Sequence, residues 1–226
     1  MRRETSTLNS SRVIISFLIA VFLLIFAFLI GYMVSFMNYQ RISSIQDTIK
    51  IDILSTQLAG ELLGECNKEA FNIFSENLDQ SGSLLFILED RFGKDDVNVL
   101  EQKKQYTLLE IQHFLAVKDY SRRCSDDIDT ILFFYSNQED YMDQAENIGK
   151  VLNRIKGEKE SDLMIYSFDY DLDIKILTLM KHIYSVNFPN TIVINEVFVL
   201  ENVNNINDIR PHIEGTRVKK DVIVLN

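Results

Sequence analysis

The residues of this sequence that are best suited to chemistry are its two cysteines, Cys66 and Cys124. Enzymes that exchange thiols and disulfides usually carry a C-x-x-C motif, because one thiolate must quickly resolve the mixed disulfide that the other has formed. The two cysteines here lie far apart in the chain, so we expect a structural disulfide that stabilises the fold by roughly 4 kcal/mol. Two free thiols and a redox-active pair are the alternatives.

Two further patterns have the spacing of metal sites. Glu110 and His113 are separated by three positions, which places a carboxylate and an imidazole on one face of a helix, but di-iron bundles need this pair twice. Asp169, Asp171 and Asp173 match the opening of a calcium loop, although the glycine and the glutamate that complete such a loop are missing. We therefore expect no metal and no cofactor, and read the aspartates as caps or solvated side chains.

The composition excludes several classes of protein. With 46% hydrophobic and 25% charged residues, the chain is of ordinary globular type. The formal net charge of -10, with no cluster of Lys and Arg, argues against a partner that is a nucleic acid. The glycine-rich phosphate loops and the G-x-S-x-G motif are also missing, so the sequence indicates neither a nucleotide enzyme nor a hydrolase.

The N-terminal region predicts a membrane anchor. Val13–Met37 contains no charged residue, and at about 1.5 Å per residue it is long enough to cross a bilayer. A cleavable signal peptide is the main alternative, but its apolar region would be shorter and would end in an A-x-A-like site. We expect an uncleaved helix in contact with membrane lipid. Arg2, Arg3 and Arg12 precede it, so residues 1–12 should form a cytoplasmic tail and the C-terminal part should be extracytoplasmic.

Residues 38–126 predict an extracytoplasmic helical stalk or bundle, because apolar residues recur in them every three or four positions. The predicted elements are a long helix over Ile42–Asn77, a break at Gln80–Ser83, and shorter helices over Leu84–Phe92 and Tyr106–Tyr120. These helices would hold the next domain away from the membrane. A coiled coil that binds a partner or a second copy is the alternative.

Residues 127–226 change character, because runs of β-branched and aromatic residues alternate there with helical stretches. The predicted elements are strands at Ile131–Tyr135 and Leu163–Phe168, helices at Glu139–Ile155 and Ile174–Tyr184, a hairpin of Thr191–Ile194 with Val197–Leu200, and a short helix at Ile206–Ile213. Ser136 should cap the first helix in a capping box with Glu139, and Asp171 or Asp173 should cap the second. The fold class is therefore α/β, in the order β-α-β-α-β-β-α.

This order, with the strand sequences ILFFYSN and MIYSFD and the hairpin start TIVIN, resembles the thioredoxin-like superfamily over about Thr130–Gly215. In redox-active members, the first strand leads into a C-x-x-C motif at the start of the next helix, where N–H groups and the helix dipole stabilise a thiolate. The resemblance places Gln138 and Tyr141 at the two cysteine positions, with Glu139 and Asp140 between them. It therefore implies a degenerate domain that has no nucleophile there.

The superfamily also places a cis-proline just before its third strand, in a loop that docks extended peptides in many members. The matching loop here consists of Phe188, Pro189, Asn190 and Thr191. Either Pro189 is displaced by one residue, or Asn190 fills the position of the proline. The resemblance implies that a cleft between Gln138 and Asn190 binds a polypeptide without chemistry.

These observations predict a single-pass protein of the cell membrane whose redox-inactive, thioredoxin-like domain is a protein or peptide interaction module. Thiol-disulfide exchange or redox sensing through Cys66 and Cys124 is the enzymatic alternative, and it would require both sulfurs to lie exposed near Gln138. A third possibility is an assembly protein that forms a homo-oligomer through its membrane-proximal helix.

Overall fold

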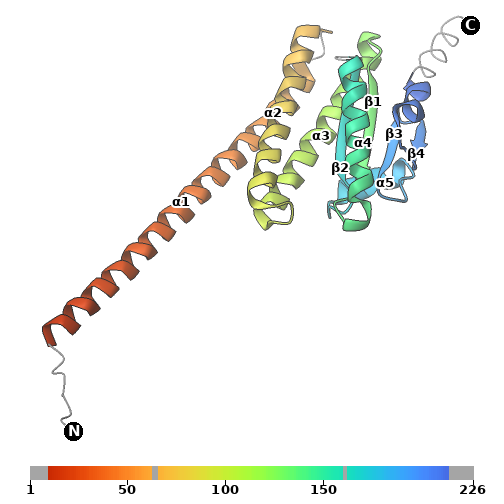
Figure 1. Cartoon of the computed structure of the whole chain (residues 1–226). Helices are drawn as coiled ribbons and strands as arrows, with labels where there is room; N and C mark the ends of the chain where they lie inside the picture. Colours follow the sequence, from red (N-terminus) through yellow and green to blue (C-terminus); the bar gives the residue numbers. More distant parts are fainter. Residues whose placement is uncertain (1–9, 63–65, 160–161, 214–226) are drawn as a thin grey trace, which may run out of the picture. The chain divides into compact units, whose positions relative to one another are not determined.

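The structure is a computed structural model that describes residues 10–62, 66–159 and 162–213 (Figure 1). Its elements in chain order are α1 Ser10–Leu62, α2 Lys68–Phe92, α3 Val97–Cys124, β1 Asp129–Tyr135, α4 Glu139–Lys159, β2 Leu163–Asp169, α5 Lys175–Ile183, β3 Thr191–Ile194 and β4 Phe198–Leu200. A last helix follows over residues 206–213. The chain divides into two compact units, Met1–Asp47 and Thr48–Asn226, which are described separately.

The first unit contains most of a helix with the properties of a membrane anchor. Within α1, the segment Arg12–Met37 is 26 residues long and has a mean hydropathy of 3.3, and it is the one segment of the described ranges long and apolar enough to span a membrane. Its large apolar side chains are exposed to the surroundings rather than packed against protein, as expected of a helix that faces lipid. The predicted span over Val13–Met37 therefore lies in a helix suited to a membrane.

The predicted continuation of one helix as far as Asn77 is wrong. α1 ends at Leu62, and α2 begins at Lys68. Between them, Cys66 has a φ of 43°, which lies outside the right-handed helical region. Asn67 Oδ1 then accepts a hydrogen bond, 3.0 Å long, from the N–H two residues later. A side-chain acceptor of this kind starts a new helix, so two helices with the same apolar rhythm follow each other.

The predicted break at Gln80–Ser83 is also wrong, because α2 continues through these residues. Ser81 is fully buried. A Cβ atom added to Gly82 would lie 2.7 Å from the hydroxyl oxygen of Tyr106 on α3. The small residues therefore allow two helices to approach closely, and they do not end the helix that contains them.

The four strands form a mixed sheet in the order β2-β1-β3-β4. β1 pairs in parallel with β2 along its whole length and antiparallel with β3, and β3 and β4 form the predicted hairpin. Every residue of β1 except the last is buried, which explains its continuous apolar sequence. Among the described residues β2 is an edge strand, and one side of its backbone has no strand partner there.

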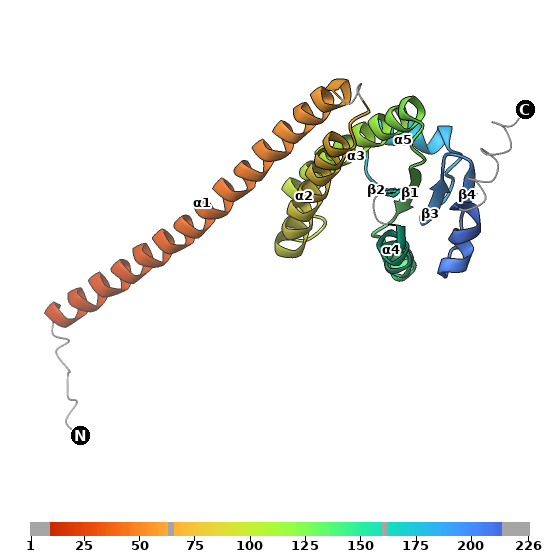
Figure 2. The same cartoon turned by 90° about the horizontal axis from the view of Figure 1, so that it is seen from above.

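Helices cover both faces of the sheet (Figure 2). On one face, α3 and α5 pack on a cluster that includes Phe114 and Phe134. On the other face, α4 and the last helix pack on a cluster that includes Phe133 and Ile148. Neighbouring residues of a strand point to opposite faces, and the pair Phe133 and Phe134 thus contributes to both clusters.

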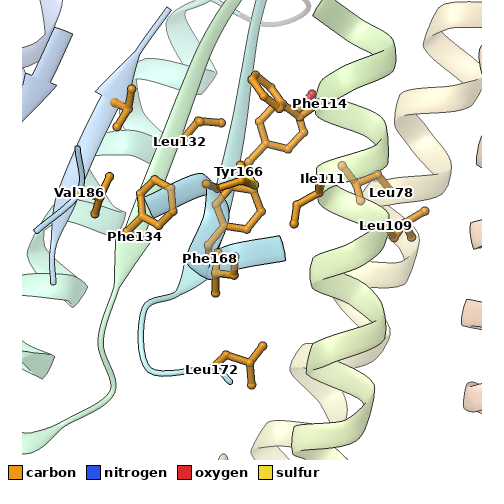
Figure 3. Packing of buried hydrophobic residues seen from close by; sticks show 13 residues of the cluster. Leu78, Leu109, Ile111, Phe114, Leu132, Phe134, Tyr166, Phe168, Leu172 and Val186 are labelled. Atoms are coloured by element: carbon orange, nitrogen blue, oxygen red, sulfur yellow. The ribbon is translucent and has the colours of Figure 1, made fainter. Parts of the chain in front are cut away.

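The α2–α3 hairpin shares its core with the sheet. Leu78 of α2 and Leu109 and Ile111 of α3 lie in one buried cluster with Tyr166 and Phe168 of β2 (Figure 3). The helices predicted as a stalk therefore contribute to the layer that covers one face of the sheet. The predicted domain boundary between residues 126 and 127 stays a prediction, and apolar packing is continuous across it.

Candidate functional site

The start of α4, which the resemblance matches to a redox site, is closed by hydrogen bonds. The N–H of Ser136 donates to Oδ1 of Asn190 at 3.3 Å. The Ser136 hydroxyl accepts the N–H of Gln138 and donates to the carboxylate of Asp171. The capping box with Glu139 is wrong, because the N–H that it needs is bound to Asn190. Two segments that follow later in the chain thus hold the helix start.

Asn190 is the central residue of this arrangement. Its side chain has an exposure of 0%, and Nδ2 donates to the carbonyl of Tyr141 at 2.9 Å and to Oε1 of Gln144 at 3.0 Å. Its φ of 61° lies in the left-handed region, which asparagine tolerates better than most residues. The described residues contain no cis peptide bond. One amide side chain therefore joins the loop before β3 to the first turns of α4.

The loop Phe188–Thr191 presents one side chain outward and buries the others in part or in full. Phe188 is 59% exposed, whereas Asn190 and Thr191 are buried. Thr191 Oγ1 donates to the carbonyl of Phe188 at 2.7 Å, which closes the loop on itself. The loop is thus tied to the first turns of α4 through Asn190, and the predicted cleft between Gln138 and Asn190 stays a prediction.

A buried ion pair lies at the carboxyl end of β2. Lys103 on α3 is 2% exposed, and its Nζ lies 3.2 Å from Oδ2 of Asp169 and 2.7 Å from Oε1 of Glu89 on α2. Asn137 Nδ2 donates to the same oxygen of Asp169 at 3.0 Å. A buried charge is costly unless it has such partners, so this cluster fixes the α2–α3 hairpin against the ends of β1 and β2.

The aspartates that match a calcium loop bind groups of the protein itself. Asp171 Oδ1 accepts from Nε2 of Gln138 at 2.8 Å, and Asp169 Oδ1 accepts the N–H of Asp171 at 3.1 Å. The predicted cap of α5 by Asp171 or Asp173 is wrong, since the cap residue is Ile174, which makes no side-chain cap bond. Among the described residues, no group of three or more His, Cys, Asp or Glu side chains is placed to hold a metal ion.

The two cysteines form a disulfide, as predicted. Cys66 and Cys124 are joined with their Cα atoms 5.4 Å apart. Cys124 packs on a small cluster that includes Phe71 and Tyr120, next to the start of β1. Gln138 follows the opposite end of β1, roughly 20 Å away at about 3.3 Å per residue. The enzymatic alternative needs both sulfurs near Gln138, and the disulfide does not lie there.

Glu110 lies on the face of α3 that packs against β2. The residue is 3% exposed, and its Oε1 accepts the N–H of Ser167 at 2.9 Å. Its Oε2 is buried without a hydrogen-bond partner in the described part of the chain. Burial raises the pKa of Glu110 to about 8, although the bond from Ser167 acts in the opposite direction. The side chain is therefore mostly a neutral acid at pH 7, which is less costly to bury than a carboxylate.

His113 lies one turn further along the same helix, and both of its ring nitrogens have partners. Nδ1 lies 2.8 Å from the hydroxyl of Tyr166, and Nε2 lies 3.2 Å from the hydroxyl of Ser75. The ring stacks on Phe74 with the ring centres 4.4 Å apart. Burial lowers the pKa of His113 to about 3, with a smaller contribution from the charge of Lys156. The imidazole is therefore neutral at pH 7 and serves as a polar link between α2, α3 and β2.

Three adjoining cavities follow the outer edge of β2, and we call them together the β2 groove. The first, of about 480 Å³, lies between α2 and α4. The second, of about 310 Å³, lies between α4 and the end of β1, and the third, of about 320 Å³, lies at the turn after β2. Ile165 and Ser167 line the first and the second, and Lys94 and Asn137 line the second and the third. A separate cavity, of about 260 Å³, lies between α3 and the β3–β4 turn. The larger share of the open space thus lies beside the edge strand.

Sequence reasoning missed the β2 groove, because its walls come from α2, α4 and the turns at the strand ends. The one available signal was the pair Glu110 and His113, whose spacing placed both on a single helix face. Compared with protein-family models, curated proteins and solved structures, the chain has no match. The function is therefore argued from the site alone.

Proposed function

We propose that the chain is a single-pass membrane protein whose extracytoplasmic, thioredoxin-like domain binds a protein or peptide partner and performs no thiol chemistry. From β1 to the last helix, the elements follow the order β-α-β-α-β-β-α. This is the order that the resemblance implies. The β2 groove supplies a surface of the size that a peptide segment would need.

The proposed orientation depends on charge and on the disulfide. Three arginines precede the span, whereas Arg41 and Lys50 after it are balanced by Asp47 and Asp52. This asymmetry favours a cytoplasmic N-terminus. Both cysteines then lie in a compartment where disulfides persist, which agrees with the bond between Cys66 and Cys124.

The Asn190 bridge is the observation that carries the proposal. At the helix start where a redox domain would present a thiolate, the side chain of Asn190 holds the N–H of Ser136 and the carbonyl of Tyr141. Both of these backbone groups are therefore hydrogen-bonded within the protein. A helix start of this kind fits a domain that is kept for its shape and its surface.

Site-specific photo-cross-linking in intact membranes tests the proposed binding. A photoreactive amino acid replaces Asn153, an exposed residue that lines the β2 groove, or Lys175, an exposed residue on α5. We expect a discrete adduct with another protein from position 153 and none from position 175. Equal labelling at both positions, or none at either, would refute a binding role for the groove.

A thiol-exchange assay tests the second part of the proposal. The full chain in detergent is mixed with reduced glutathione and a disulfide-bonded protein substrate. We expect no turnover above that of a variant in which Cys66 and Cys124 are both serine. Turnover that disappears in the double variant would show that the disulfide is catalytic, and the enzymatic alternative would then replace this proposal.

A further inference from the structure

The outer edge of β2 determines what the groove can bind. Alternate residues of a strand direct their N–H and C=O groups to opposite sides. The N–H of Ser167 donates to Glu110, on the side away from β1. Leu163, Ile165 and Ser167 therefore direct their backbone groups outward, and Leu163 and Ser167 each have a side-chain partner on that side.

These two side-chain partners leave a gap between them. Lys156 Nζ donates to the carbonyl of Leu163, and Glu110 accepts the N–H of Ser167. Among the described residues, none bonds to the N–H or the C=O of Ile165. Ile165 also lines two of the three cavities. A free N–H and C=O on one edge residue can form a pair of hydrogen bonds with an extended peptide.

We infer that the β2 groove binds an extended, Lys- or Arg-containing segment of a partner protein, whose backbone pairs with Ile165. This inference deepens the proposed function and rests on it. Pairing at a single residue fixes the register of the bound segment, since Lys156 and Glu110 occupy the positions on either side. Successive side chains of the segment would then point alternately towards the α2 wall and the α4 wall.

Charge complementarity selects a basic segment. Asp169 at the end of β2 and Asp171 after it are bound internally. The other charged residues of the groove are Glu76, Asp79, Asp95 and Glu146 against Lys94 and Lys156. Glu76 and Asp79 lie on the α2 wall, together with the apolar side chain of Leu78. An acidic wall attracts a cation on the ligand, and low salt strengthens the attraction.

The electrostatics of Asp79 agree with this choice. Burial raises the pKa of Asp79, the charge of Lys156 lowers it in part, and the neighbouring Glu76 raises it by a smaller amount than Lys156 lowers it. A ligand ammonium beside Asp79 would add a second favourable charge to that of Lys156. A second copy of this chain is a poorer occupant, because a net charge of -10 on each copy causes repulsion.

Peptide binding to the full chain in a neutral detergent tests the inference by fluorescence anisotropy. The probe is a short labelled peptide of alternating valine and lysine. Its matched controls are the same peptide with alternate backbone nitrogens methylated, and a peptide of alternating valine and glutamate. We expect methylation in the pairing register to raise the Kd about tenfold or more, since it removes backbone hydrogen bonds. The glutamate peptide should not bind.

Variants of the protein separate the groove from general acidity. E76Q/D79N should raise the Kd of the lysine peptide by about fivefold or more, whereas E101Q/E201Q, which neutralises the same number of exposed carboxylates outside the groove, should leave it unchanged. Equal binding of all three peptides, or equal effects of the two double variants, would overturn the inference. Self-association that replaces peptide binding would identify a second copy as the occupant. A cross-link from Asn153 without peptide binding would remove this inference and leave the proposed function intact.

Discussion

Replacing Glu110 by glutamine should change how the stability of the protein depends on pH. Glutamine keeps an acceptor for the N–H of Ser167 but cannot ionise. In the native state burial raises the pKa of Glu110 to about 8, from an ordinary value of 4.5. The folded state therefore binds more protons than the unfolded state between these two pH values. The stabilising contribution of Glu110 to the free energy of unfolding is present in full below pH 4.5 and is lost as the pH rises towards 8.

His113 acts with the opposite sign. Burial lowers its pKa to about 3 from an ordinary value of 6.5, so the unfolded state binds more protons and stability rises with pH over that range. Between pH 4.5 and 6.5 the two groups change stability by about 2 kcal/mol each, because the slope falls below its full 1.36 kcal/mol per pH unit near the unfolded pKa of each group, and their effects cancel. Above pH 6.5 the effect of Glu110 remains and stability falls.

The magnitude for Glu110→Gln follows from this linkage. Relative to the natural chain, the free energy of unfolding of the variant should rise by roughly 4 kcal/mol between pH 4.5 and pH 8. Taking this difference removes the contributions of His113 and of every other titrating group that is unchanged. Urea unfolding of both proteins in detergent, followed by circular dichroism at several pH values, measures it.

The matched control for this experiment is Glu101→Gln, which changes an exposed glutamate on the same helix. It measures the effect of replacing a glutamate by glutamine at an exposed position of this helix. A difference for Glu110→Gln that is constant from pH 4.5 to 8 would refute the reasoning, because it would mean that Glu110 ionises equally in the folded and unfolded states.

Three further predictions concern packing, the Asn190 bridge and the disulfide. Gly82→Ala should destabilise the protein by about 1 kcal/mol, because the added Cβ meets the Tyr106 hydroxyl; adding Tyr106→Phe should restore most of this, and a double-mutant cycle by thermal unfolding checks it. Asn190→Ala should cost about 3 kcal/mol through unsatisfied buried polar groups and a left-handed φ, as measured by urea unfolding; a change below the error of the measurement would contradict the bridge. Replacing Cys66 and Cys124 by serine should cost about 2 to 4 kcal/mol, with a lower Tm than the oxidised protein has.

The strands could be predicted from the sequence because their signals are local. The apolar run of β1 reflects burial on both faces, and the pair Asn195 and Glu196 marks the turn of the β3–β4 hairpin. The disulfide could also be predicted, because only one pairing is possible. The strands depend on a few residues that are close in the chain, and the disulfide follows because the sequence has two cysteines.

The features that were missed depend on contacts between remote residues. Gly82 reads as a helix breaker until Tyr106 of the next helix is placed against it. Asn190 reads as a loop residue until the start of α4 is placed beside it. The β2 groove requires the arrangement of several elements around an edge strand, and no single stretch of sequence contains it. Periodicity alone also could not detect the boundary between α1 and α2, since the apolar rhythm continues across it.

The disulfide also determines how mechanical tension would pass through the chain. Cys66 lies just before α2 and Cys124 ends α3, so the covalent bond provides a direct path that bypasses the whole hairpin between them. A pull between the anchor and the C-terminal domain would run from α1 through the sulfurs directly into the strand that follows. The residues enclosed by the bond, including Glu110 and the α2 wall of the groove, would bear none of that load along their backbone. Reduction of the disulfide would make the load pass along the backbones of α2 and α3.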